Sequence, residues 1–154
     1  MKAEYINPFL EATMTVIKSV CDVDIKFDNV YIREASYTVS DLIIIIGVTG
    51  KVRGQAILSM GEDTAKSIAS YMMGGIPVES IDAMAKSAIG ELGNMIMGNT
   101  CSIFYGRGIA IDITPPTILT GEKVEISNKF KTLCIPATLG EFGTMEIGVS
   151  AEEV

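Results

Sequence analysis

Apolar side chains recur at helical intervals in the first part of the chain. Within residues 4–20, the positions that share one helix face are Phe9, Thr13, Val16, Ile17 and Val20. Pro8 stands in the first turn, where its missing N–H is not needed for a helical hydrogen bond. The pattern therefore predicts a helix over residues 4–20.

Extended patterns follow this helix. Residues 25–37 are rich in β-prone side chains, and residues 42–48 form an unbroken apolar run with four consecutive isoleucines. Residues 49–50, Thr-Gly, separate that run from a further extended stretch at residues 51–60. We expect the two stretches to form a hairpin whose first strand is covered on both faces.

Two helices are predicted in the middle of the chain. Glu62 and Asp63 place negative charge at the start of the first, and the glycines at residues 74–75 end it. Its periodic apolar positions are Ala65, Ile68, Ala69 and Met72. Ser80 can cap a second, longer helix that runs to about residue 99.

Strand patterns return in the last third of the chain, at residues 109–113, 130–135 and 145–149. Pro115 and Pro116 fix an extended bend after the first of them. This order of elements predicts an α/β fold of the α+β type, with an antiparallel sheet and helices packed on one face.

Composition favours one compact domain over residues 1–154, because 48% of the side chains are apolar and only 20% are charged. No apolar run is long enough for a signal peptide or a membrane span, so we expect a cytoplasmic protein without membrane insertion. A net charge of −7 disfavours nucleic acid and anionic membranes as partners. A protein or a small molecule remains as the expected partner.

The chain has no histidine, and its three cysteines lie far apart without a Cys-x-x-Cys pair. Catalysis by a Ser-His or Cys-His pair is therefore excluded, and a structural zinc would lack its usual ligands. Glycine-rich nucleotide-binding motifs are also absent. We interpret Cys21, Cys101 and Cys134 as small core residues and expect no cofactor or metal of the protein's own.

The longer helix carries two distinct strips of side chains. The strip expected to face the sheet consists of Ile81, Ala85, Ala88, Leu92, Met95 and Ile96. A second strip, about 110° away by the helical period, consists of Ser87, Glu91, Asn94 and Gly98. Glu91 and Asn94 therefore stand side by side on an accessible flank.

A carboxylate beside a carboxamide offers one strong acceptor together with a group that both donates to and accepts from water. Such a pair can hold a water molecule but cannot itself attack. Gly90, Gly93 and Gly98 each cost about 1 kcal/mol relative to alanine in this helix, and their small size would let another backbone or domain approach. Spacing alone does not separate this arrangement from an ordinary solvated helix face.

Five segments, in chain order, resemble one known family. They are residues 6–13 (INPFLEAT), 72–78 (MMGGIPV), 88–96 (AIGELGNMI), 98–99 (GN) and 112–117 (DITPPT). The sequence resembles the CheC/CheX/FliY family of CheY-phosphate phosphatases of bacterial chemotaxis, and within it the CheX branch.

The resemblance implies a CheC-like fold and dephosphorylation of a phosphorylated CheY-type response regulator, which itself carries the phosphoaspartate and its Mg²⁺. Asn94 would position the attacking water, and Glu91 would pair with the regulator's active-site lysine. Ser87 and Gly98 become candidate partner-binding residues on the same strip. The resemblance also implies a homodimer joined through the sheet.

CheC-type members carry two Glu-x-x-Asn signatures, whereas Met14 stands here three residues after Glu11, which implies a single active site.

Two alternatives to the phosphatase function remain. One alternative is a module that docks on a regulator or flagellar switch without hydrolysis, although such switch relatives lack the pair. The other is a small-ligand sensor whose cavity is lined by some of the nine methionines, which fit equally well as core residues.

Overall fold

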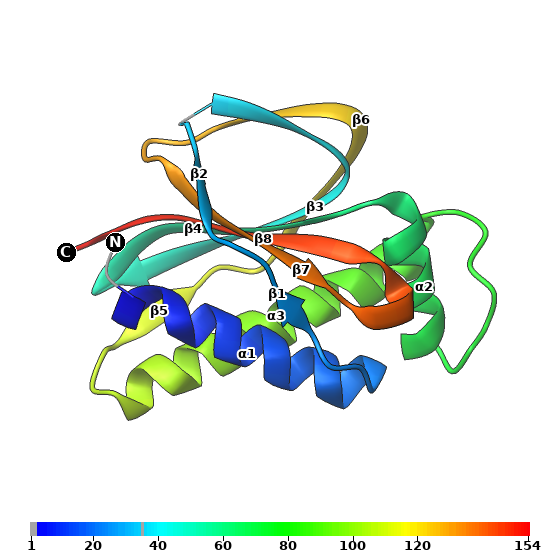
Figure 1. The fold of residues 1–154 in the computed structure, drawn as a ribbon, viewed down its shortest axis with the longest axis horizontal. Helices are drawn as coiled ribbons and strands as arrows, with labels where there is room; N and C mark the ends of the chain where they lie inside the picture. Colours follow the sequence, from blue (N-terminus) through cyan, green and yellow to red (C-terminus); the bar gives the residue numbers. More distant parts are fainter. Residues whose placement is uncertain (1–2, 35) are drawn as a thin grey trace.

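Figure 1 shows the chain in a computed structural model that describes residues 3–34 and 36–154. The helices are α1 (Ala3–Cys21), α2 (Glu62–Met72) and α3 (Ala83–Gly106), with a short 3-10 turn, η1 (Gly140–Phe142). The strands are β1 (Lys26–Phe27), β2 (Tyr31–Arg33), β3 (Ser36–Gly50), β4 (Val52–Met60), β5 (Ile111–Ile113), β6 (Thr117–Ser127), β7 (Thr132–Thr138) and β8 (Thr144–Glu153).

Every strand pairing among the described residues is antiparallel, and together they make one sheet. The order across it is β1-β7-β8-β4-β3-β5, with β2 also on β7 and β6 also on β3. In the predicted hairpin, Leu42 lies opposite Met60 and Val48 opposite Gly54. The hairpin prediction is therefore confirmed, and it supplies the centre of the sheet.

Helices α1 and α3 lie beside each other under one face of the sheet, and α2 packs near one end of α3 (Figure 1). Phe9 and Phe104, both buried, meet edge to face with ring centroids 5.7 Å apart. Buried side chains of all three helices and of the sheet form a continuous core. One face of α3 is therefore fixed against the sheet, and the other faces outward.

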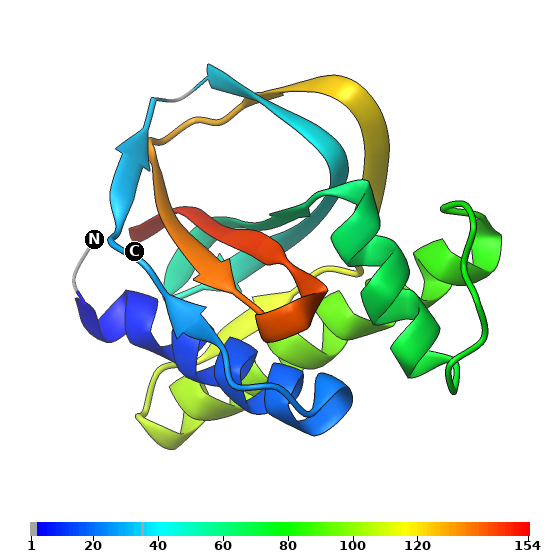
Figure 2. The same ribbon diagram turned by 45° about the vertical axis from the view of Figure 1, so that its right-hand side comes forward.

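The opposite face of the sheet carries an arm formed by residues 36–41 of β3 and residues 121–127 of β6. Figure 2 shows this arm extending away from the helices and curving back over the sheet. Ile126 from the arm packs with Ile43 and Ile57 in a second apolar cluster. Residues 42–48 of β3 are therefore covered on both faces, as predicted.

The predicted fold class is confirmed, but several element boundaries were wrong. Strand β6 was not predicted, because its side chains are mostly exposed and its order comes from pairing with the distant β3. The region 25–37 divides into the short strands β1 and β2 and the first two residues of β3, and residue 35 lies outside the described part. Pro115 and Pro116 separate β5 from β6, where the bend was expected.

Candidate functional site

Helix α3 begins two residues later than the sequence suggested. Asp82, not Ser80, is the N-cap, and its Oδ1 accepts a hydrogen bond from the backbone N–H of Ala85 at 2.9 Å. The helix then continues through Gly98 to Gly106, beyond the predicted end near residue 99. The angles between residues of the helix are unchanged by these two corrections, because they depend on the helical period rather than on the ends.

The buried face of α3 differs in part from the predicted strip. Its buried residues are Ala85, Ile89, Gly90, Leu92, Gly93, Ile96, Met97, Thr100 and Phe104. Ala88 and Met95 are only partly buried, and Ile81 precedes the helix. The strip is therefore rotated toward Ile89 and Gly93, and two of the three glycines lie on the sheet side.

Gly90 and Gly93 let α3 approach its own sheet. A Cβ added at Gly93 would lie 3.1 Å from Cγ2 of Ile44, and one added at Gly90 would lie 3.0 Å from Cδ1 of Ile118. A Cβ at Gly98 would meet nothing within 4 Å. Gly90 and Gly93 therefore admit the close approach of the chain's own sheet and not of another domain, and of the three glycines Gly98 alone has open space around it.

Ser87, Glu91, Asn94 and Gly98 are all exposed on the outward side of α3. Within the described residues, neither Glu91 nor Asn94 forms a side-chain hydrogen bond or an ion pair. Three residues apart on a helix, their Cβ atoms are about 5–6 Å from each other. Both side chains are therefore available to an incoming molecule, on a backbone held close to the sheet by the neighbouring glycines.

The chemistry open to this pair is limited to hydrogen bonding and ion pairing. Cys21 and Cys134 are buried, and burial raises the pKa of the Cys134 thiol to about 12, which disfavours a nucleophilic thiolate. In the described part of the chain, no three His, Cys, Asp or Glu side chains gather as a metal site. The arrangement suits a surface that adds polar groups to another molecule's reaction centre.

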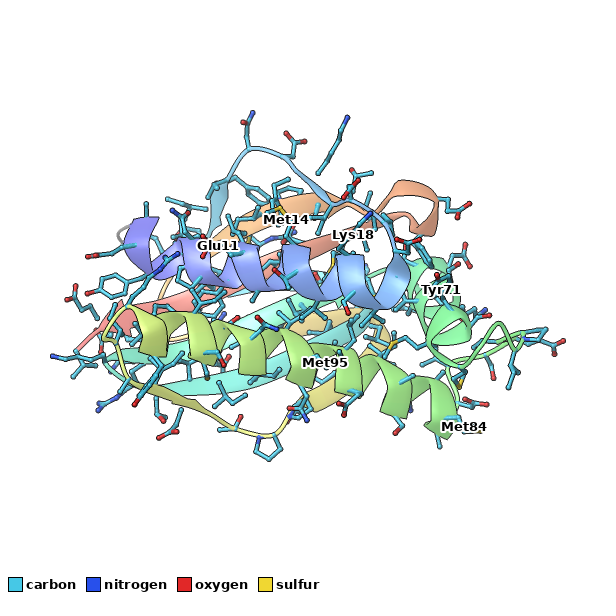
Figure 3. The ribbon with its side chains drawn as sticks, turned by 90° about the horizontal axis from the view of Figure 1, so that it is seen from below. Glu11, Met14, Lys18, Tyr71, Met84 and Met95 are labelled. Atoms are coloured by element: carbon cyan, nitrogen blue, oxygen red, sulfur yellow. The ribbon has the colours of Figure 1, made fainter. Side chains whose placement is uncertain are left out.

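On α1, the position that corresponds to a second Glu-x-x-Asn signature carries Glu11 followed by Met14 in place of asparagine. The carboxylate of Glu11 accepts a hydrogen bond from Nη2 of Arg107 at 2.7 Å, which joins α1 to the end of α3. Met14, three residues later, is 46% exposed, and Figure 3 shows both side chains on α1. Glu11 thus already has a cationic partner within the chain, whereas Glu91 has none among the described residues.

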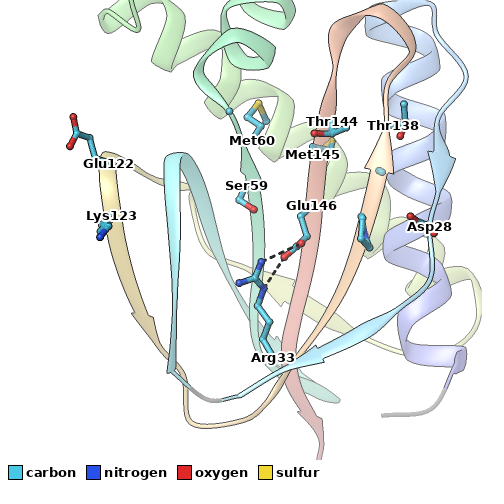
Figure 4. Close-up of a pocket in the computed structure, with 13 residues that line it drawn as sticks. Asp28, Arg33, Ser59, Met60, Glu122, Lys123, Thr138, Thr144, Met145 and Glu146 are labelled. Carbon is cyan, nitrogen blue, oxygen red and sulfur yellow. Dashed lines mark hydrogen bonds and ion pairs between the residues drawn. The ribbon is translucent and has the colours of Figure 1, made fainter.

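A hollow that the sequence did not indicate lies on the opposite side of the sheet, under the arm (Figure 4). Its volume is about 650 Å³, and Arg33 crosses it to Glu146, with Nε and Oε1 3.2 Å apart. Tyr31 also donates a hydrogen bond to Glu146. This ion pair fastens β2 to β8 across the intervening β7, far from the exposed pair on α3.

Comparison with known proteins identifies the family. Residues 42–138 match the family described as Chemotaxis phosphatase CheX. The chain is 32% identical over 139 residues to a Thermotoga maritima protein named CheY-P phosphatase CheX, with 90% of each sequence covered. Several solved structures are also similar to it over nearly the whole chain, among them one from Shewanella and one from Borrelia burgdorferi.

The first of these structures is a CheC-like superfamily protein from Shewanella sp. PV-4, with a TM-score of 0.85, 25% identity and 99% of each chain covered. The second is a complex of CheX, CheY, BeF3 and Mg²⁺ from Borrelia burgdorferi, with a TM-score of 0.83, 28% identity and coverage of 99% of this chain and 100% of that one. In addition, none of the helices in the described residues has the length and apolar character needed to cross a bilayer.

Fold and comparisons together define a phosphatase of the CheC-like class. The chain belongs to the CheX family of chemotaxis phosphatases. The predicted family and enzyme class are confirmed, whereas the roles of Glu91, Asn94, Ser87 and Gly98 stay predictions.

Proposed function

We propose that this chain hydrolyses the phosphoaspartate of a CheY-type response regulator, using Asn94 and Glu91 as the groups it adds to the regulator's site. The observation that carries the proposal is their joint exposure on one face of α3 without partners among the described residues. Support comes from the curated relative, whose name makes it a CheY-P phosphatase, and from the α3 segment lying inside the matched residues 42–138.

Asn94 is proposed to position the attacking water. Its carboxamide donates one hydrogen bond and accepts another, so it can hold a water in line with the phosphorus without removing a proton. Phosphoryl transfer depends mainly on positioning and on charge stabilisation, so a group of this kind lowers the barrier. The effect of Asn94 should therefore appear in the maximal rate more than in binding.

Glu91 is proposed to pair with the regulator's active-site lysine. An exposed carboxylate about one helical turn from Asn94 can form a charge-assisted hydrogen bond with that lysine, which fixes the depth and direction of insertion. The Mg²⁺ in the Borrelia burgdorferi complex accompanies CheY and BeF3, which supports the expectation that the metal comes with the regulator. Bound there, Mg²⁺ would neutralise charge on the phosphoryl oxygens.

Ser87 and Gly98 are proposed as contact residues at either side of the pair. Both are exposed, and the open space around Gly98 lets a partner's backbone approach α3 closely. The Ser102 hydroxyl donates to the carbonyl of Gly98 at 3.2 Å, which satisfies part of the backbone there. These contacts would orient the regulator without taking part in the chemistry.

The test follows loss of radiolabelled phosphate from a CheY-type regulator in the presence of Mg²⁺. Wild type should accelerate the loss, and Asn94→Ala should reduce that acceleration at least tenfold, equivalent to about 1.4 kcal/mol of barrier. Asn99→Ala is the matched control, because Asn99 lies on the same helix about 140° away by the helical period. Full activity in the Asn94→Ala variant would refute the proposed mechanism.

The same assay distinguishes hydrolysis from the alternative function, a module that docks on the regulator without hydrolysis. In that case the regulator would bind, but wild type and Asn94→Ala would leave its phosphate loss at the rate in buffer. The intact Glu-x-x-Asn pair and the 32% identity to a protein named as a phosphatase favour hydrolysis.

A further inference from the structure

An exposed apolar patch lies where α3 begins. Met84 is 64% exposed and Ile76, in the loop before the helix, is 58% exposed. Both line a hollow of about 280 Å³ together with Pro77 and Val78. Figure 3 shows Met84 at the end of α3 nearest this loop. We call Ile76, Pro77 and Met84 the entrance patch.

The entrance patch continues the strip that carries the proposed catalytic pair. Met84 precedes Glu91 by seven residues, which on a helix is about 10 Å along the axis and about 20° around it. Ser87, one turn after Met84, bridges the interval on the same strip. A regulator that receives Asn94 and Glu91 into its phosphorylation site covers Met84 as well if its contact surface extends two turns toward the start of α3.

Charge around the entrance patch is acidic. Glu79 and Asp82 line the same hollow, both are exposed, and neither has an ion-pair partner among the described residues. Glu91 extends this negative charge along α3, and the whole chain carries −7. The surface that fits here is apolar with basic side chains at its margin, in keeping with the lysine proposed to meet Glu91.

We infer that the entrance patch docks an apolar, basic-flanked surface of the same regulator molecule, beside its phosphorylation site. The inference rests on the proposed function. Exposed apolar side chains that are continuous with a polar site are typical of interfaces, and the flexible methionine side chain adapts to varied contours. Because the patch lies away from the reacting atoms, its contacts stabilise ground state and transition state alike, and it contributes affinity rather than rate.

The test measures the Kd for a regulator charged with beryllofluoride and Mg²⁺, a state that needs no hydrolysis. The double variant Ile76→Ser, Met84→Ala should raise Kd at least tenfold, about 1.4 kcal/mol, while the rate at saturating regulator changes less than twofold. The matched control is Ile32→Ser, Met14→Ala, at side chains that are 60% and 46% exposed elsewhere on the molecule. It should change Kd less than twofold.

Two substitutions of opposite charge at Met84 test whether the partner surface has a basic margin. Met84→Lys should weaken binding more than Met84→Glu, because the partner's margin is basic. The opposite order, or an unchanged Kd in the double variant, would overturn the docking inference. A loss of dimer mass in the double variant would instead assign the patch to a second copy of this chain and would overturn it too.

Failure of the two proposals can be told apart. Hydrolysis by wild type with an unchanged Kd in the patch variant would remove only the docking inference. Binding that depends on the patch, without hydrolysis, would remove only the proposed function. An absence of binding by wild type would remove both.

Discussion

The approach of α3 to the sheet can be tested with two glycines of the same helix. Replacing Gly98 by alanine adds a methyl group where nothing lies within 4 Å. We expect the free energy of unfolding to rise by about 1 kcal/mol, the difference between glycine and alanine in a helix interior. For a chain of this length, that corresponds to about 2–4 °C in Tm.

Gly93→Ala gains the same helical preference but meets the sheet. Its methyl group would lie 3.1 Å from Cγ2 of Ile44, and 3.5 Å from Cδ1 of Ile44 and of Ile46. Both isoleucines are fully buried, so they can move little, and overpacking of this kind costs about 1–3 kcal/mol. The net effect should lie between about 0 and −2 kcal/mol, which places it about 1–3 kcal/mol below Gly98→Ala.

Urea denaturation followed by circular dichroism measures both variants against wild type under identical conditions. The gain in helix propensity is the same in both variants, so the difference between their free energies of unfolding measures the contact at Gly93 with the sheet. Equal stabilisation by Gly93→Ala and Gly98→Ala would show that α3 does not lie so close to β3, and it would contradict the account of how the exposed pair is held.

Three further predictions concern other parts of the molecule. Glu11→Ala should leave regulator dephosphorylation within twofold of wild type, because Glu11 already pairs with Arg107, and a drop to the level of Glu91→Ala would indicate a second active site. The Tyr5 hydroxyl donates to Glu153 at 2.6 Å, which raises the pKa of Tyr5 to about 12, above about 10 in the unfolded chain. Its contribution to stability should be complete below pH 10 and lost as the pH rises from 10 to 12, so Tyr5→Phe should flatten the fall in denaturation midpoint over that window; an identical pH profile in Tyr5→Phe would refute this. Light scattering should give twice the chain mass of 16.5 kDa if the chain forms the homodimer joined through the sheet that the family resemblance implies, and the single-chain mass would rule out that dimer.

The elements that sequence alone predicted well are those with a strong local period. The unbroken apolar run at residues 42–48 identified a strand covered on both faces, and the glycines at residues 74–75 marked the end of α2. The exposure of Glu91 and Asn94 also followed from the helical period alone. These features need no knowledge of the partner segment.

The features that sequence missed depend on segments far apart along the chain. Strand β6 is mostly polar and exposed, and only its pairing with the first half of β3 makes it a strand. Gly90 and Gly93 look free to admit a partner until Ile118 and Ile44 are found against them. The cap of α3 was misplaced because Ser80 and Asp82 are both good N-cap residues, and local sequence does not choose between them.

The most direct test of the central claim is a single-turnover measurement with the phosphatase in large excess over the phosphorylated regulator. At saturation the observed rate reports the chemical step rather than binding. Asn94→Ala should lower the saturating rate at least tenfold while the half-saturating concentration changes little. Glu91→Ala should lower the saturating rate and raise the half-saturating concentration. A saturating rate for Asn94→Ala equal to wild type would contradict the assignment of Asn94 as the residue that positions the attacking water.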